Sequence, residues 1–392
     1  MLKFFLIVSM LALFLLVPSL APASNFWCII CFDYEVQFGD QHGGDYWTDT
    51  SEKIGRGMKV KITRNYDSVI LYNDYALADN GCLPESLQLS SERSYNITAY
   101  TEAKFDNNNK VKVENNDDAN AIYYQVLAPY FIPEGSQTYT FTYQLSELKL
   151  SNIAAAAGYT TYKRATNLLG LTSILYTQPF DEDGGNGFRD NAVYLDDLGR
   201  NRKYIIAHEL GHHLASHFNG DDGDFNNFSA DGGSCPDGGG VNDHHLNSKE
   251  YQTAGATEGF AHFISAGVWN NISETDCFYH LWAWVDYDWD TFHDTYEEDG
   301  HYSCEDYSSY MEEWCNTPWD NRSVEIDWLK FWWDLLTNTD ATWTNIENIW
   351  DEANPDTWDA TNVYSRLRNA AINEDIDMDD WDYWANHNGV DH

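Results

Sequence analysis

The chain has 392 residues, of which 63 are acidic and 22 basic, so its formal net charge is −41 at pH 7. This charge argues against nucleic acids and anionic membranes as partners, because both would repel the chain. Aromatic residues make up 16% of the sequence, which argues against a disordered protein despite the charge.

Residues 1–23 have the pattern of a secretory signal peptide. Lys3 gives a positive start, residues 4–16 are nearly all apolar, and the small residues at 21–23 suit a cleavage site. The apolar run is too short to span a membrane comfortably, although an uncleaved anchor is the alternative. We therefore expect a secreted protein that leaves the membrane after signal cleavage; the oligomeric state is not predicted.

The cysteines support an exported protein, in which disulfides are the default. They stand at positions 28, 31, 82, 235, 277, 304 and 315. Cys304 with Cys315 and Cys235 with Cys277 are candidate pairs, which leaves one of the three N-terminal cysteines unpaired. The connectivity stays open, because spacing alone does not fix it.

Short segments of residues 24–145 alternate apolar and polar residues, as β-strands do. The alternation is clearest in Met58–Ile62 and Thr138–Leu145. Further strand candidates, separated by Asn, Asp and Gly, are Ser68–Tyr72, Tyr95–Tyr100 and Ala121–Leu127. Several short strands with turn signals predict a β-sandwich domain. The segment carries no catalytic constellation, so a binding domain and an inhibitory pro-region are both open.

The pattern changes near residue 146, where helical and strand signals begin to mix. Helices are indicated at Ser146–Leu169 and Thr253–Trp269, and strands at Leu171–Tyr176 and Asn191–Asp196. Residues 202–218 form another predicted helix, with an apolar residue at every fourth position from 206 to 218. One face of that helix should therefore be buried, and a neighbouring face should point toward a cleft.

Tryptophan dominates the rest of the chain, since 13 of the 16 Trp residues follow residue 280. Helical patterns cover Val324–Leu336, Asn345–Trp350 and Asn362–Ile372. The Trp residues are most simply explained as the core of a helical subdomain, because Trp is mostly buried. A sugar-binding aromatic platform is the alternative.

The most informative motif is His208-Glu209-Leu210-Gly211-His212, an HExxH sequence on a predicted helix. Histidines four residues apart lie on one face of a helix, so both imidazoles can bind one metal ion. Zinc lowers the pKa of a bound water to about 7, and Glu209 is placed to take its proton. His213 is rotated about 100° from His212, so it should be a surface or packed residue.

Catalytic zinc needs a third protein ligand and one open position. The extended pattern HExxHxxGxxH fails, because Ala215 and Phe218 occupy the Gly and last His positions. A glutamate from a later helix is the alternative, and the segment Glu258-Gly259-Phe260-Ala261-His262 fits it. On these motifs the chain resembles the gluzincin zinc metallopeptidases, whose third ligand lies in an ExxxD or ExxAD helix.

The resemblance implies that His208, His212 and Glu258 bind zinc and that Glu209 is the general base. His262 stands where the family has an aspartate that hydrogen-bonds a ligand histidine. The expected fold class is α+β. A β-sandwich-like domain (24–145) would precede a zincin-like catalytic domain (146–270) and a helical Trp-rich subdomain (271–392).

Some site residues stay open. Other candidates for the third ligand are Asp221, Asp222, His244, His245 and His262. The resemblance also implies a donor to the oxyanion downstream of Glu258. Candidates for this donor are His280, His293, His301 and Tyr302.

Calcium is a second candidate metal, because three acidic runs gather oxygen ligands. They lie at Asp181–Asp183, Asp221–Asp224 and Asp375–Asp379. The last run lacks the glycine and the final glutamate of an EF-hand loop, so solvated acidic loops are the favoured interpretation.

The sequence thus predicts a secreted zinc metallopeptidase that cleaves a protein or peptide substrate. A zinc-activated water would attack the peptide bond, with Glu209 as general base. One alternative is a non-catalytic secreted binding protein with a vestigial zincin unit. The other is a zinc hydrolase that acts on a non-peptide bond.

The charge has two interpretations, a well-solvated surface and an adaptation to a saline medium. If the chain is salt-adapted, its melting temperature should rise between low and molar sodium chloride, because the screening length falls from about 30 Å to about 3 Å. Thermal melts across this series measure the effect. A melting temperature that stays level would leave solubility as the only reason for the charge.

Overall fold

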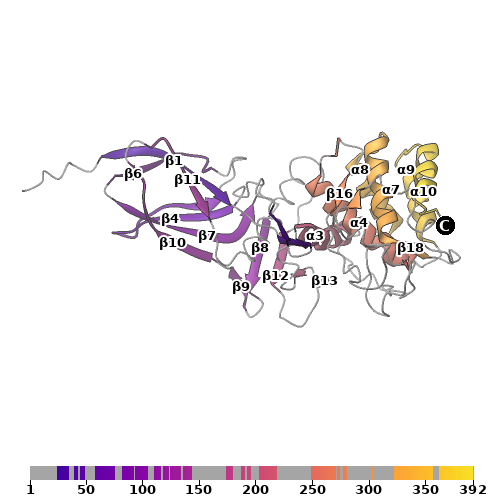
Figure 1. Ribbon diagram of the computed structural model, residues 1–392, viewed down its shortest axis with the longest axis horizontal. Helices are drawn as coiled ribbons and strands as arrows, with labels where there is room; N and C mark the ends of the chain where they lie inside the picture. The colour runs from indigo at the N-terminus through magenta and orange to yellow at the C-terminus, as the bar shows by residue number, and fades with distance from the viewer. Residues whose placement is uncertain are drawn as a thin grey trace, which may run out of the picture.

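The computed structural model combines a β-rich N-terminal part with a helical C-terminal part (Figure 1). It describes residues 24–34, 39–42, 45–48, 58–75, 82–91, 93–104, 110–115, 118–122, 124–133, 136–143, 174–179, 187–189, 192–195, 203–218, 249–270, 272–273, 277–279, 302–303, 322–355 and 362–391. The molecule is elongated, with the strands of the first half at one end and helices α7 to α10 at the other.

Two sheets make up most of the β-rich part. Its strands are β1 (Asn25–Tyr34), β2 (Gly39–His42), β3 (Asp45–Thr48), β4 (Met58–Arg64), β5 (Ile70–Tyr75), β6 (Leu87–Ser90), β7 (Ser94–Lys104), β8 (Lys110–Asn115), β9 (Asp118–Ile122), β10 (Tyr124–Phe131) and β11 (Thr138–Tyr143). Later strands are β12 (Ile174–Pro179), β13 (Gly187–Arg189), β14 (Ala192–Leu195), β15 (Lys249–Tyr251), β16 (Phe278–Tyr279), β17 (Tyr302–Ser303) and β18 (Arg322–Val324).

The smaller sheet has the order β11-β1-β6, with β1 in the middle. Strand β1 runs parallel to β11 and antiparallel to β6. A disulfide between Cys31 and Cys82 ties β1 to the segment before β6, and Cys28 is buried with a free thiol. Cys277 also belongs to a disulfide, whose partner lies outside the described residues. One of the three N-terminal cysteines is therefore unpaired, as predicted.

The larger sheet follows the order β13-β14-β12-β8-β7-β4-β5, with β10 beside β7 and β9 beside β8. Strand β12 pairs with β8 in parallel, so one sheet contains strands from both sides of residue 145. The pairing of β8 with β12 therefore joins the β-rich part to the strands that precede the helix with the HExxH motif. The sandwich architecture and the predicted domain boundaries stay predictions.

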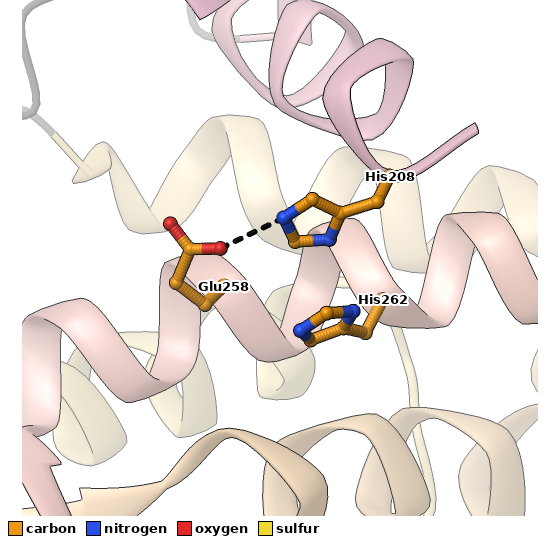
Figure 2. Close-up of side chains that lie close together, drawn as sticks. All are labelled: His208, Glu258 and His262. Atoms are coloured by element: carbon orange, nitrogen blue, oxygen red, sulfur yellow. Dashed lines mark ion pairs between the residues drawn. The ribbon is translucent and has the colours of Figure 1, made fainter. Parts of the chain in front are cut away.

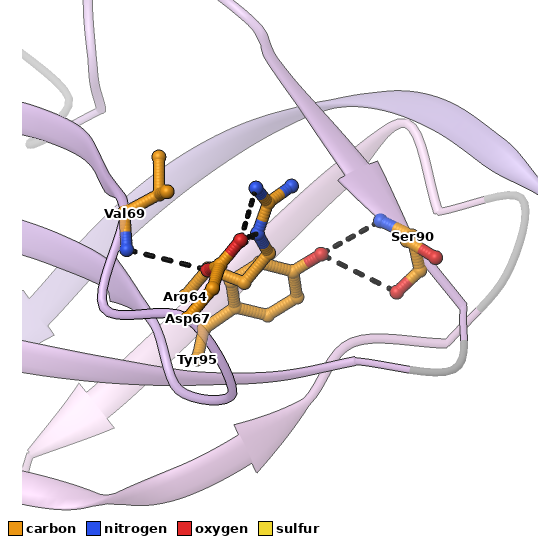
Figure 3. A network of polar contacts seen from close by, with 5 residues as sticks. All are labelled: Arg64, Asp67, Val69, Ser90 and Tyr95. Atoms are coloured by element: carbon orange, nitrogen blue, oxygen red, sulfur yellow. Dashed lines mark hydrogen bonds and ion pairs between the residues drawn. The ribbon is translucent and has the colours of Figure 1, made fainter.

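Local hydrogen bonds fix the turn between β4 and β5 (Figure 3). Arg64 donates to both carboxylate oxygens of Asp67, and the backbone N–H of Val69 donates to Asp67 Oδ1. The Arg64 guanidinium lowers the pKa of Asp67 to about 2. Tyr95 of β7 accepts a 2.7 Å hydrogen bond from the backbone N–H of Ser90 in β6, which links the two sheets.

The helices carry most of the predicted apolar patterns. They are α3 (Lys203–Phe218), α4 (Gln252–Trp269), α7 (Glu325–Asn338), α8 (Trp343–Ala353), α9 (Val363–Asn373) and α10 (Met378–His387). Five of these helices match the predicted segments closely, but α10 was not predicted. The acidic run Asp375–Asp379, a candidate calcium loop, leads into the first turn of α10. Asp377 caps this helix and accepts a 2.9 Å hydrogen bond from the N–H of Asp379.

Aromatic residues form the core of the helical part. Phe260 stacks on Trp350 at 3.9 Å between ring centroids, and Phe263 stacks on Trp343 at 4.6 Å. The indole N–H of Trp350 donates to the backbone carbonyl of Ala215, which ties α8 to α3. The Trp residues of α7, α8 and α10 that the structure describes are mostly buried, so their role in a helical core is confirmed.

Helices α3 and α4 cross in backbone contact. A Cβ atom on Gly211 would lie 2.8 Å from both Cα and O of Ala261, closer than real Cβ atoms approach. The crossing therefore requires a glycine at position 211 of α3. Residues 205–216 are buried throughout, more than the predicted single face, because α4, α8, β13 and β14 all contact α3.

Among the described residues, no helix is both long enough and apolar enough to cross a bilayer.

Gly211→Ala should destabilise the helical part by about 1–3 kcal/mol, because the new methyl group overpacks the crossing. Glycine to alanine in an ordinary helix interior gives the opposite sign, stabilising by about 0.5–1 kcal/mol. Urea unfolding followed by Trp fluorescence measures the change. Asn369→Ala, at an exposed position of α9, is the control for helix propensity. Equal stability of Gly211→Ala and wild type would contradict the close crossing.

Candidate metal centre

The crossing of α3 and α4 brings chemically active side chains together. His208 lies three residues before Gly211 and His212 one residue after it, in the same way as Glu258 and His262 flank Ala261. Because residues four apart share a helix face, both pairs project toward the crossing. Figure 2 shows Glu258 and His262 projecting from α4 toward His208 of α3.

Three atoms converge most closely. Glu258 Oε2 lies 2.9 Å from His208 Nε2 and 3.0 Å from His212 Nε2. The two Nε2 atoms lie 3.1 Å apart, and their rings are almost perpendicular, with 81° between the planes. The three ligands expected from the sequence are thus brought together by two helices, although His212 and Glu258 are 46 residues apart along the chain.

A second grouping of possible ligands replaces His212 with His262. Ligand atoms of His208, Glu258 and His262 lie within 4.8 Å of one another. However, the His262 ring stacks on that of His208 at 4.0 Å with only 30° between the planes. A ring nitrogen coordinates in the plane of its ring, so stacked rings are poorly oriented to bind one ion. The set with His212 is therefore the better candidate.

The candidate ligands are buried, and burial sets the charge of at least one of them. His208 is 6% exposed and Glu258 is 3% exposed. Burial, followed by the electrostatic effect of the neighbouring His262, lowers the pKa of His208 to about 3, so its imidazole is neutral at pH 7. Neutral imidazole is the form that binds metals. A divalent ion here would also compensate the negative charge of the buried carboxylate.

The donor set fits zinc. Two imidazole nitrogens and one carboxylate oxygen are established ligands of catalytic zinc. In a tetrahedral site with metal distances of about 2.0–2.1 Å, ligand atoms lie about 3.3 Å apart. The distances of 2.9 to 3.1 Å among the three atoms are close to this value. These residues could therefore bind one zinc ion.

Glu209 and His213 lie on α3 beside the candidate ligands, and both are buried. The carboxylate of Glu209 belongs to the HExxH motif, in which it acts on a substrate water and is not a ligand. His213 is packed within the protein, which agrees with one of its two predicted positions.

His262 does not form a hydrogen bond with the Nδ1 atom of His208. That atom is buried without a hydrogen-bond partner among the described residues. His262 instead places its Nε2 3.0 Å from Glu325 Oε2 of α7. Sequence reasoning missed Glu325, because it lies 63 residues beyond His262 and belongs to no motif.

The remaining candidates have no described place near this centre. Tyr302 belongs to β17. Outside the described residues lie Asp181, Asp183, Asp221, Asp222, Asp224, His244, His245, His280, His293 and His301. Asp375, Asp377 and Asp379 are described, but the group able to bind a metal among the described residues does not include them. Calcium therefore stays a prediction.

Comparison with known proteins does not assign the chain. Neither the models of known protein families nor the sequences of curated proteins match it.

Removal of single ligands separates the two possible sets. At saturating zinc, His262→Ala should keep about one zinc per chain, whereas His212→Ala and Glu258→Ala should lose it, because only the latter two remove ligand atoms. Equilibrium dialysis against saturating zinc, followed by atomic emission, gives the zinc content. If His262→Ala loses the ion and His212→Ala keeps it, the ligand set with His262 is the correct one.

Proposed function

We propose that the chain is a secreted zinc-dependent peptidase of the gluzincin type. The observation that supports it most directly is the convergence of His208 Nε2, His212 Nε2 and Glu258 Oε2 within 3.1 Å. The HExxH spacing places Glu209 on the same helix as the two histidines. The motif resemblance implies zinc ligation for the two histidines and Glu258, and a general-base role for Glu209.

In the proposed reaction, three residues bind the metal ion and a fourth transfers the proton. His208, His212 and Glu258 would hold the ion. When bound, zinc supplies Lewis acidity, which polarises a carbonyl and lowers the pKa of a water to about 7. Glu209 accepts a proton from the attacking water and returns it to the amide nitrogen as the peptide bond breaks. The buried surroundings strengthen the electrostatic interactions of these groups.

The charge distribution supports basic peptides as preferred substrates. Residues 271–392 contain 30 acidic and 4 basic residues, so the helical part is more acidic than the chain as a whole. A negative surface raises the local concentration of positive substrates and repels acidic ones. This preference concerns the rate of encounter, so it should weaken as salt is added.

Secretion belongs to the same proposal and is supported by two observations. The N-terminal 23 residues have the signal-peptide pattern. The Cys31–Cys82 disulfide suits an oxidising compartment, in which such bonds persist.

Glu209→Gln should lower kcat for casein and peptide libraries by about 10²–10⁴-fold, because it removes the proton acceptor. Its zinc content should stay at about one per chain, since Glu209 is not a ligand. Residues 24–392 are assayed for hydrolysis and zinc on the same samples.

Glu102→Gln is the matched control. Glu102 is also a buried glutamate, paired with Lys59 at 2.9 Å in the β-rich part, so its substitution perturbs stability away from the centre. It should leave hydrolysis unchanged. A wild-type chain that binds zinc but cleaves no substrate would support the binding-protein alternative instead.

A further inference from the structure

Two buried residues outside the ligand set form a pair directly behind the candidate centre. His262 of α4 and Glu325 of α7 are 2% and 1% exposed, and their Nε2 and Oε2 atoms lie 3.0 Å apart. Burying a carboxylate beside an imidazole is costly unless both groups are held in good geometry. The pair therefore calls for an explanation beyond packing.

The pair reaches the centre through ring stacking. The His262 ring lies against the His208 ring at 4.0 Å between centroids and 30° between planes (Figure 2). A ligand histidine is usually oriented by a hydrogen bond from its other ring nitrogen. His208 Nδ1 has no such partner among the described residues, so stacking on His262 is a contact that can replace this hydrogen bond in orienting the ring.

The backbone holds Glu325 firmly in place. It is the first residue of α7, where the helix dipole favours a negative side chain. A Cβ atom on Gly259 would lie 2.6 Å from the carbonyl oxygen of Glu325. It would also collide with the side chain of Trp328. The N-terminus of α7 is thus pressed onto α4 one turn before His262. This contact restricts movement of Glu325. Because Glu325 is paired with His262, it also restricts the His262 side chain.

We propose that Glu325 and His262 are positioning residues, which hold the His208 ring in its ligating orientation by stacking. This inference rests on the zinc site of the proposed function. It assigns a role to the histidine that stands where the gluzincin pattern has aspartate. It also couples the metal centre to the aromatic core, because Glu325 belongs to the helix that carries Trp328 and Trp332.

Metal affinity tests the inference independently of hydrolysis. Residues 24–392 are titrated with zinc against a chelator, and with cobalt(II), whose visible bands report the arrangement of its ligands. His262→Ala and Glu325→Ala should each weaken zinc binding by about 10–100-fold and shift the cobalt bands, because the His208 ring can then rotate. Glu325→Gln retains a hydrogen-bonding group of the same length, so its zinc affinity should be closer to that of the wild type than the affinity of Glu325→Ala.

A matched pair isolates stacking from folding effects. His262→Phe and His262→Ala are each combined with Glu325→Gln, so that neither leaves a charged carboxylate without its imidazole. The Phe combination keeps a flat ring and should bind zinc more tightly than the Ala combination. Asn388→Ala is the control, since it removes a buried 2.8 Å hydrogen bond to Asp334 of α7 far along the helix. It should lower stability without changing the cobalt spectrum.

The outcomes separate this inference from the proposed function. Unchanged zinc affinity in both alanine variants, or equal affinity of the Phe and Ala combinations, overturns the positioning role and leaves the peptidase proposal intact. Weakened binding with no hydrolysis by the wild type overturns the peptidase proposal and leaves the positioning role. Loss of the ion from His262→Ala at saturating zinc would make His262 a ligand and overturn the role assigned here.

Discussion

The backbone contact between Gly211 and Ala261 is the constraint on which the candidate centre depends. A methyl group at position 211 would collide with the backbone of α4, so the two helices meet without side chains between them. At this close separation, side chains from both helices reach one point. The convergence of His208, His212 and Glu258 is a direct consequence, because each lies within one turn of the crossing.

A second layer of contacts keeps the crossing in place. Helix α7 presses on α4 at Gly259, and the indole of Trp350 in α8 donates to the carbonyl of Ala215 in α3. Each helix of the pair is therefore fixed by a neighbour from the aromatic core. Close-packed interiors transmit strain, so substitutions in the Trp-rich core should shift the candidate ligands. The tryptophans thus stabilise the candidate centre indirectly, because they pack against the two helices that carry its residues.

The sequence predicted the parts of this arrangement that are local. Helix α3 and the spacing of its histidines follow from a four-residue repeat, and Glu258 follows from a short motif on the next helix. The Glu325 contact could not be predicted, because it depends on how α7 docks against α4. The helix α10 was missed for a different reason: Asp377 suits both a calcium loop and a helix N-cap, and composition could not choose between them. The parallel pairing of β8 with β12 is another long-range contact without a local signal.

Burial distinguishes a few acidic residues with a specific structural or functional role from the many that lie on the surface of this acidic chain. The chain has 63 acidic residues, and a soluble protein can keep nearly all of them in water. Among the described residues, those that are buried are Glu102, Glu209, Glu258, Glu325, Asp327 and Asp334. Two of these carboxylates directly contact histidines of one cluster, and a third follows His208 in the chain. Desolvating carboxylates beside imidazoles opposes folding, so stability alone does not explain this concentration. A bound cation would supply the missing compensation, which makes the metal site the simplest physical reason for the arrangement.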